Sequence, residues 1–248
     1  MQPYLNQMNS ILTELFVEYA RVYRAPGILL SGGIDSSMIS YFVSSNFKEY
    51  TILSMGTEKT KDKKYIDIMS DYLKKPYIWI DITEQNLATD ITVIKQLLKN
   101  EGVEINIMQV SLAAGYFTIF KKAQELGITH IFTGQGPDIL LGGYHKYESV
   151  TNINEEIKKD LPLLEIDKKR DGAMAKHFGI TLINPYLENT FIDFALAIPQ
   201  EYLVQGREKK LILRELGKKV GLPAEIVNRP KKAFQYSTGI QDMIAKIY

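Results

Sequence analysis

The spacing of apolar positions at the start of the chain predicts a long amphipathic helix. Apolar side chains recur every three or four residues, at Leu5, Met8, Leu12, Leu15, Tyr19 and Val22. This spacing places them on one face of an α-helix, and such a face is normally buried against the rest of a domain. We therefore expect residues 1–24 to form an N-terminal packing helix.

Short apolar runs then alternate with stretches of helical periodicity. Runs with the length of buried strands lie at residues 27–30, 50–55, 77–82 and 130–133. Helical spacing fills the intervals, at residues 36–45, 64–73, 87–100 and 108–126. Strands separated by helices imply right-handed crossovers and a parallel sheet. The pattern predicts an α/β domain over residues 25–147.

Strand signals stop after about Tyr147. Helical spacing returns at residues 192–198, 209–220 and 224–227. Three prolines punctuate these segments, as expected near helix starts and breaks, at Pro185, Pro199 and Pro223. We expect residues 148–248 to form a helical C-terminal lobe packed on the α/β domain.

Composition excludes several classes of function. The chain has 248 residues and a formal net charge of +1, which gives no global sign of a nucleic-acid or membrane partner. No apolar run approaches the roughly 18 residues of a membrane helix, and the N-terminus lacks the pattern of a signal peptide, so a cytoplasmic protein is expected. The absence of cysteine excludes disulfides, thiolate metal sites and cysteine nucleophiles. The three histidines, His130, His145 and His177, show no metal-ligand spacing.

Residues 31–37, Ser-Gly-Gly-Ile-Asp-Ser-Ser, join the first predicted strand to a helix. Glycines let the backbone approach a ligand closely, and the N–H groups at the start of a helix attract an anion. Hydroxyls at Ser31, Ser36 and Ser37 add donors, so a phosphate is the expected occupant. Asp35 would repel a phosphate unless Mg²⁺ bridges the two, because Mg²⁺ binds through few carboxylates together with phosphate oxygens.

Two other nucleotide-binding patterns are missing from the sequence. No stretch matches Gly-x-x-x-x-Gly-Lys-Ser/Thr, and no Gly-x-Gly-x-x-Gly follows a strand. A kinase-like or dinucleotide-binding function is therefore disfavoured. A glycine-rich turn with a capping serine is the structural alternative, but the full heptapeptide after an apolar strand favours a phosphate site.

The heptapeptide resembles the signature loop of the N-type ATP pyrophosphatase (PP-loop) superfamily, whose members split ATP between its α and β phosphates. The resemblance implies a doubly wound parallel sheet of the adenine nucleotide α-hydrolase type. It also implies that adenine lies near the ends of the first two strands. By that resemblance, Leu30 and the strand end at Ser54 and Met55 flank the adenosine.

Residues 133–144, Thr-Gly-Gln-Gly-Pro-Asp-Ile-Leu-Leu-Gly-Gly-Tyr, resemble the second motif of the synthetase domain of asparagine and β-lactam synthetases. Asp35 and Asp138 would then follow neighbouring strands, at the edge where open parallel sheets bind ligands. Two carboxylates there suit Mg²⁺ held against a triphosphate, so ATP and Mg²⁺ are the expected cofactors. The ATP-binding residues that the resemblance implies are Leu30, Ser31, Gly32, Gly33, Asp35, Ser36, Ser37, Ser54, Met55, Thr133 and Gly134.

Three later stretches resemble the same family, at residues 170–174, 184–188 and 210–232. The resemblance thus runs from about residue 27 to residue 238. It implies that Lys231 stabilises the negative charge that develops on reaction, as a fixed cation does when it is aimed at that charge. The alternative is a solvated basic run or a nucleic-acid patch, but the aromatic interleaving that would stack on bases is absent.

The chain departs from the family pattern at the acceptor end. Gln135 stands where asparagine synthetases carry a glutamate implied in substrate handling or proton transfer, and glutamine cannot accept a proton. β-Lactam synthetases carry a tyrosine there, paired with a separate glutamate. We expect Gln135 at the catalytic centre, with any general base elsewhere. Because Ile183 and Glu188 replace the family's arginine and aspartate, aspartate is a default acceptor acid only.

The resemblance implies an AMP-forming ligase that activates a carboxylate as an acyl-adenylate and transfers ammonia or an amine to it. No cysteine is available for the glutaminase chemistry of standard asparagine synthetases, and about two dozen residues precede the first predicted strand. Ammonia is therefore expected free or from a separate glutaminase subunit. Two alternatives stay open: internal amide closure as in β-lactam synthetase, and a non-catalytic ATP or AMP sensor. Asp35, Asp138 and Lys231 favour an enzyme.

Overall fold

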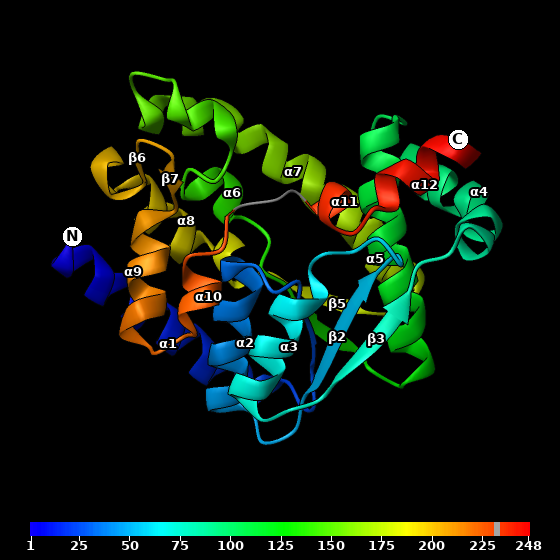
Figure 1. The fold of residues 1–248 in the computed structure, drawn as a ribbon, viewed down its shortest axis with the longest axis horizontal. Helices are drawn as coiled ribbons and strands as arrows, with labels where there is room; N and C mark the ends of the chain where they lie inside the picture. Colours follow the sequence, from blue (N-terminus) through cyan, green and yellow to red (C-terminus); the bar gives the residue numbers. More distant parts are fainter. Residues whose placement is uncertain (231–233) are drawn as a thin grey trace.

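A parallel five-stranded sheet with helices on both faces is the framework of the protein (Figure 1). The computed structural model describes residues 1–230 and 234–248. The sheet has the strand order β3-β2-β1-β4-β5, and β6 pairs with β7 in a separate antiparallel hairpin. The strands are β1 (Gly27–Leu29), β2 (Thr51–Gly56), β3 (Tyr77–Asp81), β4 (His130–Phe132), β5 (Thr181–Ile183), β6 (Val204–Gln205) and β7 (Glu208–Lys209).

Each connection between consecutive strands of the sheet contains at least one helix, as parallel pairing requires. The α-helices are α1 (Gln2–Val22), α2 (Ile34–Asn46), α3 (Lys63–Leu73), α4 (Glu84–Asn100), α5 (Ile107–Glu125), α6 (Pro137–Leu140), α7 (Ile153–His177), α8 (Asn189–Leu196), α9 (Leu211–Lys219), α10 (Ala224–Val227), α11 (Phe234–Ser237) and α12 (Ile240–Ile247). The 3₁₀ helices are η1 (His145–Glu148), η2 (Pro185–Leu187) and η3 (Gln200–Tyr202). The doubly wound parallel α/β fold expected from the sequence is confirmed.

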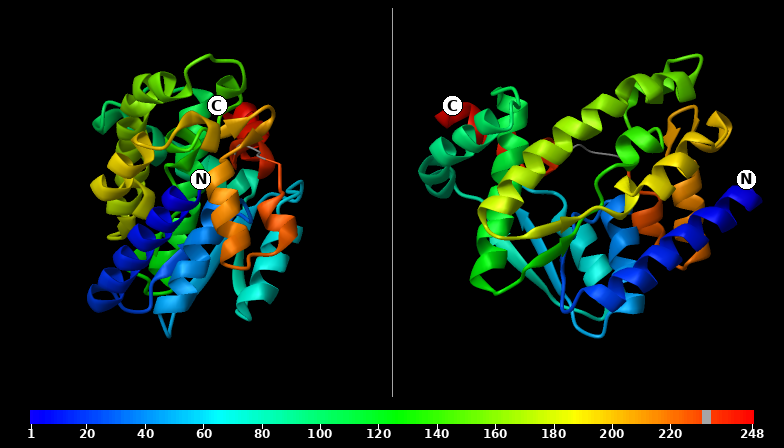
Figure 2. Two further views of the ribbon diagram at one scale, coloured as in Figure 1. Left: turned by 90° about the vertical axis from the view of Figure 1, so that its left-hand side faces the viewer. Right: turned by 180° about the vertical axis from the view of Figure 1, so that it is seen from behind.

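Alternate residues of the central strands face two separate hydrophobic cores. On β2, Ile52 belongs to the first core and Leu53 to the second, and on β4 the same holds for Phe132 and Ile131. The first core includes side chains of α1, α2, α3, α8 and α9, and the second includes those of α4, α5 and α12. These helices form layers on opposite faces of the sheet (Figures 1 and 2). Helix α7 contributes its first half to one core and its second half to the other.

The strand order reverses at the centre of the sheet. Strands β1 and β4 lie side by side, with Ile28 opposite Phe132, but the chain leaves β1 toward β2 and leaves β4 toward β5. A reversal of this kind opens a crevice at the carboxyl ends of the two strands, where open α/β sheets bind ligands. The loops at residues 31–37 and 133–144 both begin at this point.

The expectation that strands end before residue 147 is wrong. Strand β5 pairs with β4 at the edge of the main sheet, and the β6–β7 hairpin precedes α9. A three-residue strand gives too short an apolar run to stand out beside Pro185. In the hairpin, Gly206 has a φ of +59° and makes the turn, so the helix expected from residue 209 begins at Leu211.

Helix α7 was not anticipated, although it is the longest helix of the described chain. It carries many charged residues, which dilute its apolar periodicity, and Pro162 lies inside it. A proline in a helix interior normally indicates a break, because it removes one hydrogen bond. Here burial of residues such as Ile157, Leu164 and Met174 on both sides of the proline maintains the helix.

The N-terminal helix is confirmed and is part of the first core. Its residues Leu5, Met8, Leu12 and Phe16 are buried. No helix in the described residues has the length and apolarity that a membrane crossing would need.

We predict that Phe16→Ala lowers the free energy of unfolding by about 3–5 kcal/mol, the usual cost of truncating a buried aromatic side chain. Phe16 is fully buried and lies 5.4 Å from the Phe42 ring centroid and 5.3 Å from that of Phe132. Urea unfolding followed by circular dichroism measures the change. Val22→Ala is the control, because Val22 is 71% exposed and its loss should cost less than about 0.5 kcal/mol. Equal unfolding midpoints for the two variants would show that α1 is not part of the core.

Candidate active site

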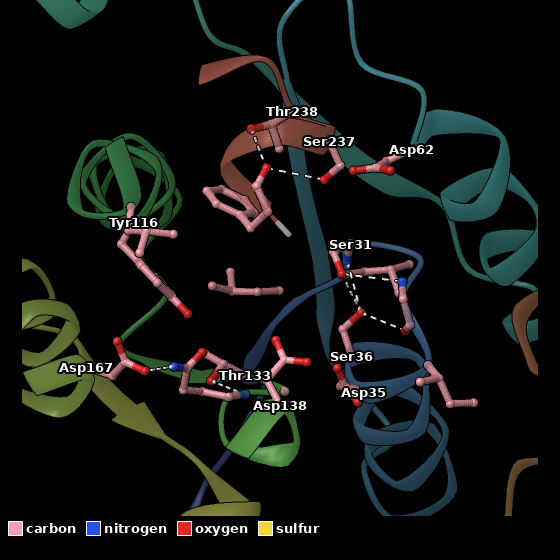
Figure 3. A pocket seen from close by; sticks show the side chains of 18 of the residues that line it. Ser31, Asp35, Ser36, Asp62, Tyr116, Thr133, Asp138, Asp167, Ser237 and Thr238 are labelled. Carbon is pink, nitrogen blue, oxygen red and sulfur yellow. Dashed lines mark hydrogen bonds between the residues drawn. The ribbon is translucent and has the colours of Figure 1, made fainter. Parts of the chain in front are cut away.

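A cavity of about 500 Å³ lies at the carboxyl edge of the sheet, above the point where the strand order reverses. Its walls come from the loops after β1 and β4, from helices α5 and α7, and from residues within 209–214, 229–230 and 234–238. Its volume is in the range of roughly 300–1,000 Å³ that is usual for small-molecule sites. Figure 3 shows how side chains from these elements surround it.

The loop at residues 31–37 brings the start of helix α2 into this cavity. Gly32 takes a φ of +69°, a conformation that side chains rarely adopt. Gly33 is the N-cap of α2. The hydroxyls of Ser31 and Ser36 lie 3.0 Å apart, and the Ser31 N–H donates to the Ser36 hydroxyl at 3.1 Å. Oriented hydroxyls beside the N–H groups of a helix start make a site for phosphate.

The loop after β4 packs directly on the backbone of this first loop. A Cβ atom at Gly134 would lie 2.7 Å from the Ser36 nitrogen and 2.8 Å from the Asp35 carbonyl carbon. Only glycine therefore permits the approach. The segment 184–188 holds both loops, since the Thr133 hydroxyl donates to Asn184 and the Tyr186 hydroxyl donates to the Asp35 carbonyl oxygen at 3.3 Å.

A buried lysine joins the two carboxylates that were expected to bind a metal. The Lys210 Nζ lies 2.5 Å from an oxygen of Asp35 and 2.6 Å from an oxygen of Asp138. Lys210 is only 2% exposed. Burial lowers the pKa of its ammonium, but the carboxylates of Asp138 and Asp35 outweigh that effect and raise the pKa, so Lys210 stays charged. The absence of a side chain at Gly143 leaves room for Lys210 and Asp138.

The same two carboxylates fit a magnesium ion. They come from two loops and converge on one cation, which in this structure is the Lys210 ammonium. Mg²⁺ typically takes one or two carboxylates and completes its shell with water and phosphate oxygens. Among the described residues no group of three or more acidic, histidine or cysteine side chains could hold a metal.

Arg229 fixes the outer side of the first loop. Its Nη1 donates to the Ser31 carbonyl oxygen at 2.9 Å, and its Nη2 forms an ion pair with Asp62. The guanidinium also lies over the Tyr65 ring, 4.2 Å from the centroid. Because Arg229 reaches the loop backbone, it positions Ser31 and does not merely add charge.

A second polar cluster lies across the cavity, on α7. The Gln135 Nε2 donates to Asp167 at 2.7 Å, and the other oxygen of Asp167 accepts from Arg170 at 2.7 Å. Arg170 also donates to Gln109 at 2.9 Å and pairs through two nitrogens with Asp171. Figure 3 shows this bond as the dashed line that ends at Asp167.

Burial shapes the charges of this cluster. Burial raises the pKa of Asp171 to about 6, against the opposing effect of the neighbouring guanidinium. Burial also lowers the pKa of Arg170, but the carboxylates of Asp171 and Asp167 outweigh it and raise that pKa. Burial and the Asp171 carboxylate raise the pKa of Tyr116, which stays neutral. The cluster thus combines one guanidinium with two carboxylates.

The asparagine synthase family model matches residues 20–174 and 161–247, which together make up most of the chain. The chain belongs to the asparagine synthase family. The two motifs that meet at the centre of the sheet lie within this match.

The relatives that this chain resembles are longer proteins, and their names indicate different products. The chain is 27% identical over 260 residues to a putative glutamine-hydrolysing asparagine synthetase of Methanocaldococcus jannaschii, a match that covers 89% of this chain and 47% of the relative. It is 26% identical to asparagine synthetase 2 of Oryza sativa, a match that covers 86% of this chain and 39% of the relative. It is 24% identical to carboxyethyl-arginine β-lactam synthase of Streptomyces clavuligerus, a match that covers 90% of this chain and 42% of the relative. The chain spans less than half the length of these relatives.

The structure brings most of the expected site residues of this family member to one cavity. Those that line it are Leu30, Ser31, Gly33, Asp35, Ser36, Met55, Thr133, Gly134, Gln135 and Asp138. Three others lie behind the lining: Gly32 lies against Tyr65, Ser37 is fully buried, and the Ser54 hydroxyl donates to the Leu30 carbonyl oxygen at 2.8 Å. Lys231 lies outside the described residues.

Other lining residues were missed by sequence reasoning. Lys210 and Arg229 lie inside the stretch that resembles the family, but no local pattern indicates that Lys210 meets both carboxylates. Arg170 lies in a matched pattern, whereas Asp167 lies just outside it and Asp62 lies in no motif. Ile183 and Glu188, the departures near the 184–188 segment, are not among the lining residues, and Glu188 accepts from Tyr19 at 2.7 Å.

We predict that Gly134→Ala weakens ATP binding at least tenfold, about 1.4 kcal/mol, because the added methyl group forces the two loops apart. Isothermal titration calorimetry measures the affinity. Gly172→Ala in α7 is the control, since its Cβ would meet nothing within 4 Å and alanine favours a helix. Unchanged ATP affinity in Gly134→Ala would show that the contact between the loops is not needed for the nucleotide.

Proposed function

We propose that the protein is an ATP-dependent, AMP-forming amide ligase. A substrate carboxylate oxygen attacks the α-phosphorus of ATP, and pyrophosphate leaves. Ammonia or an amine then attacks the acyl carbon of the adenylate, and AMP leaves as the amide forms. The observation that carries this proposal is the meeting of two glycine loops at the centre of the sheet, where Asp35 and Asp138 share one cation.

The nucleotide would bind across the carboxyl ends of β1 and β2. Leu30 and Met55 line the cavity there and offer apolar surface to adenosine. The start of α2, with the Ser31 and Ser36 hydroxyls, suits the phosphates. Asp35 and Asp138 would hold Mg²⁺, which supplies positive charge against the triphosphate.

Two lysines would act on the charge of the phosphates. Lys210 carries a buried ammonium beside Asp35 and Asp138, so it is placed to compensate charge on the departing pyrophosphate. The family resemblance gives Lys231 the role of stabilising the charge that develops at the reacting centre. A fixed cation of this kind acts mainly on the transition state and therefore raises kcat.

The acceptor acid and the attacking ammonia or amine would enter on the side of the cavity opposite the phosphates. Gln135 cannot take a proton, but it is hydrogen-bonded to Asp167, whose carboxylate can accept one from an attacking amine. Small carboxylic acids are the proposed substrates, with aspartate as the family default. Ammonia would come from solution or from a separate glutaminase subunit.

Internal amide closure is the second candidate, and the Gln135–Asp167 pair favours it. At this position β-lactam synthetases use a pair formed by a tyrosine and a separate acid, and here an amide and an acid form the pair. The two reactions differ in their products. A closing enzyme converts an amino acid to a lactam, with one carboxylate oxygen leaving in AMP, and needs no ammonia.

We predict that turnover of ATP yields AMP and pyrophosphate and increases when a suitable carboxylic acid is added. The loop at residues 31–37 and the absence of a Walker-type lysine favour cleavage between the α and β phosphates. Chromatography of the nucleotide products decides the matter. ADP with phosphate as the main pair would contradict the ligase, and tight ATP binding without any turnover would indicate a sensor.

We further predict that Asp35→Asn and Asp138→Asn each weaken Mg²⁺-dependent ATP binding about tenfold, or about 1.4 kcal/mol. Because both carboxylates would bind one ion, the double variant should lose less than the sum of the single losses. Titration calorimetry at several Mg²⁺ concentrations measures this coupling. Asp90→Asn is the matched control, a carboxylate that pairs with Lys121 outside the cavity. Strictly additive losses would exclude a shared metal.

A further inference from the structure

The cavity continues beyond the two loops into a groove between α5 and α7. Figure 3 shows Tyr116 of α5 and Asp167 of α7 across the cavity from Ser31 and Ser36. We define the acceptor groove as the lining residues that these two helices supply. They are Met108, Gln109, Leu112, Tyr116 and Ile119 of α5, and Leu163, Ile166, Asp167 and Arg170 of α7.

The outer part of the acceptor groove is apolar and open to solvent. Met108 is 46% exposed, Leu163 is 42% exposed and Ile166 is 37% exposed. Single exposed apolar residues are common on protein surfaces. Three that line the same cavity, from two helices, are not scattered in this way. Apolar side chains gathered at a pocket mouth gain free energy when an apolar ligand group covers them.

The inner part of the acceptor groove is polar and carries no available positive charge among the described residues. All three nitrogens of the Arg170 guanidinium donate to Asp167, Asp171 or Gln109. With one guanidinium against two carboxylates, the cluster does not attract a further anion. A carboxylate placed there would be repelled by Asp167 and would leave a buried charge without a partner.

The other basic residues among the described part of the lining are also engaged. Lys209 pairs with Glu148, and Arg229 pairs with Asp62. Lys210 lies beside Asp35 and Asp138, at the end of the cavity proposed for the phosphates. The remaining one, Arg214, donates to three backbone carbonyl groups. Among the described lining residues, no cation therefore remains for the second carboxylate of a dicarboxylic acid.

We propose that the acceptor is a monocarboxylic acid with an apolar body, and not aspartate or another dicarboxylic acid. This inference rests on the proposed ligase function and names its substrate class. The reacting carboxylate points toward the loop at residues 31–37, and the apolar body lies along Met108, Leu163 and Ile166. The Gln135–Asp167 pair faces the nitrogen that attacks the adenylate.

Acid-dependent exchange of labelled pyrophosphate into ATP tests the proposal with matched acids. Hexanoate and adipate have the same number of carbons and differ by one carboxylate, and aspartate represents the family default. We expect kcat/KM for hexanoate to exceed that for adipate and for aspartate at least tenfold. Ile166→Asn and Leu163→Asn should each lower kcat/KM for hexanoate about tenfold and leave the KM for ATP unchanged.

Ile105→Asn is the matched control, because Ile105 has the same 37% exposure and does not line the cavity. Ile166→Leu, which keeps an apolar side chain, should retain most of the activity of the unsubstituted enzyme with hexanoate. Circular dichroism checks that each variant folds. If aspartate or adipate is the better acid, or if Ile166→Asn behaves like Ile105→Asn, the apolar acceptor is wrong and the ligase still stands. If no acid supports exchange although ATP binds, the ligase is wrong and the acceptor class fails with it.

Discussion

The buried ammonium of Lys210 is the interaction on which the site depends. It joins Asp35, which follows β1, to Asp138, which follows β4, across the point where the strand order reverses. Two carboxylates this close repel each other unless a cation lies between them. The close backbone approach at Gly134 and the anchoring contacts of residues 184–188 bring the carboxylates together, and Lys210 makes that geometry stable without a metal. The same geometry would suit the Mg²⁺ and triphosphate of the proposed function.

The sequence was sufficient for the parts of this site that local chemistry determines. The loop at residues 31–37 could be predicted because a strand, a glycine turn and a helix start with hydroxyls form one continuous segment. Asp138 could be paired with Asp35 because parallel strands present their carboxyl ends at one edge of the sheet. The four strands up to Phe132 followed from apolar runs, and α1 followed from its periodicity.

The rest depends on contacts between distant segments. Lys210 reaches Asp35 across 175 residues of sequence, and Gln135 reaches Asp167 across 32. Nothing in the local pattern around Asp167 distinguishes it from the other charged residues of α7, and Pro162 conceals that helix. Strand β5 has only three residues, and pairing with β4 specifies it more than its own sequence does. The acceptor groove requires α5 and α7 to be placed side by side, so its apolar mouth was invisible in either helix alone.

The most direct test of the account is to follow oxygen from the acceptor acid. The enzyme is supplied with ATP, ammonium and an acid whose carboxylate carries oxygen-18, and the products are analysed by mass spectrometry. If the carboxylate attacks the α-phosphorus, one labelled oxygen appears in AMP and none appears in pyrophosphate. Label in phosphate released together with ADP, or AMP that forms without label while the acid is converted to amide, would contradict the adenylate and with it the proposed function.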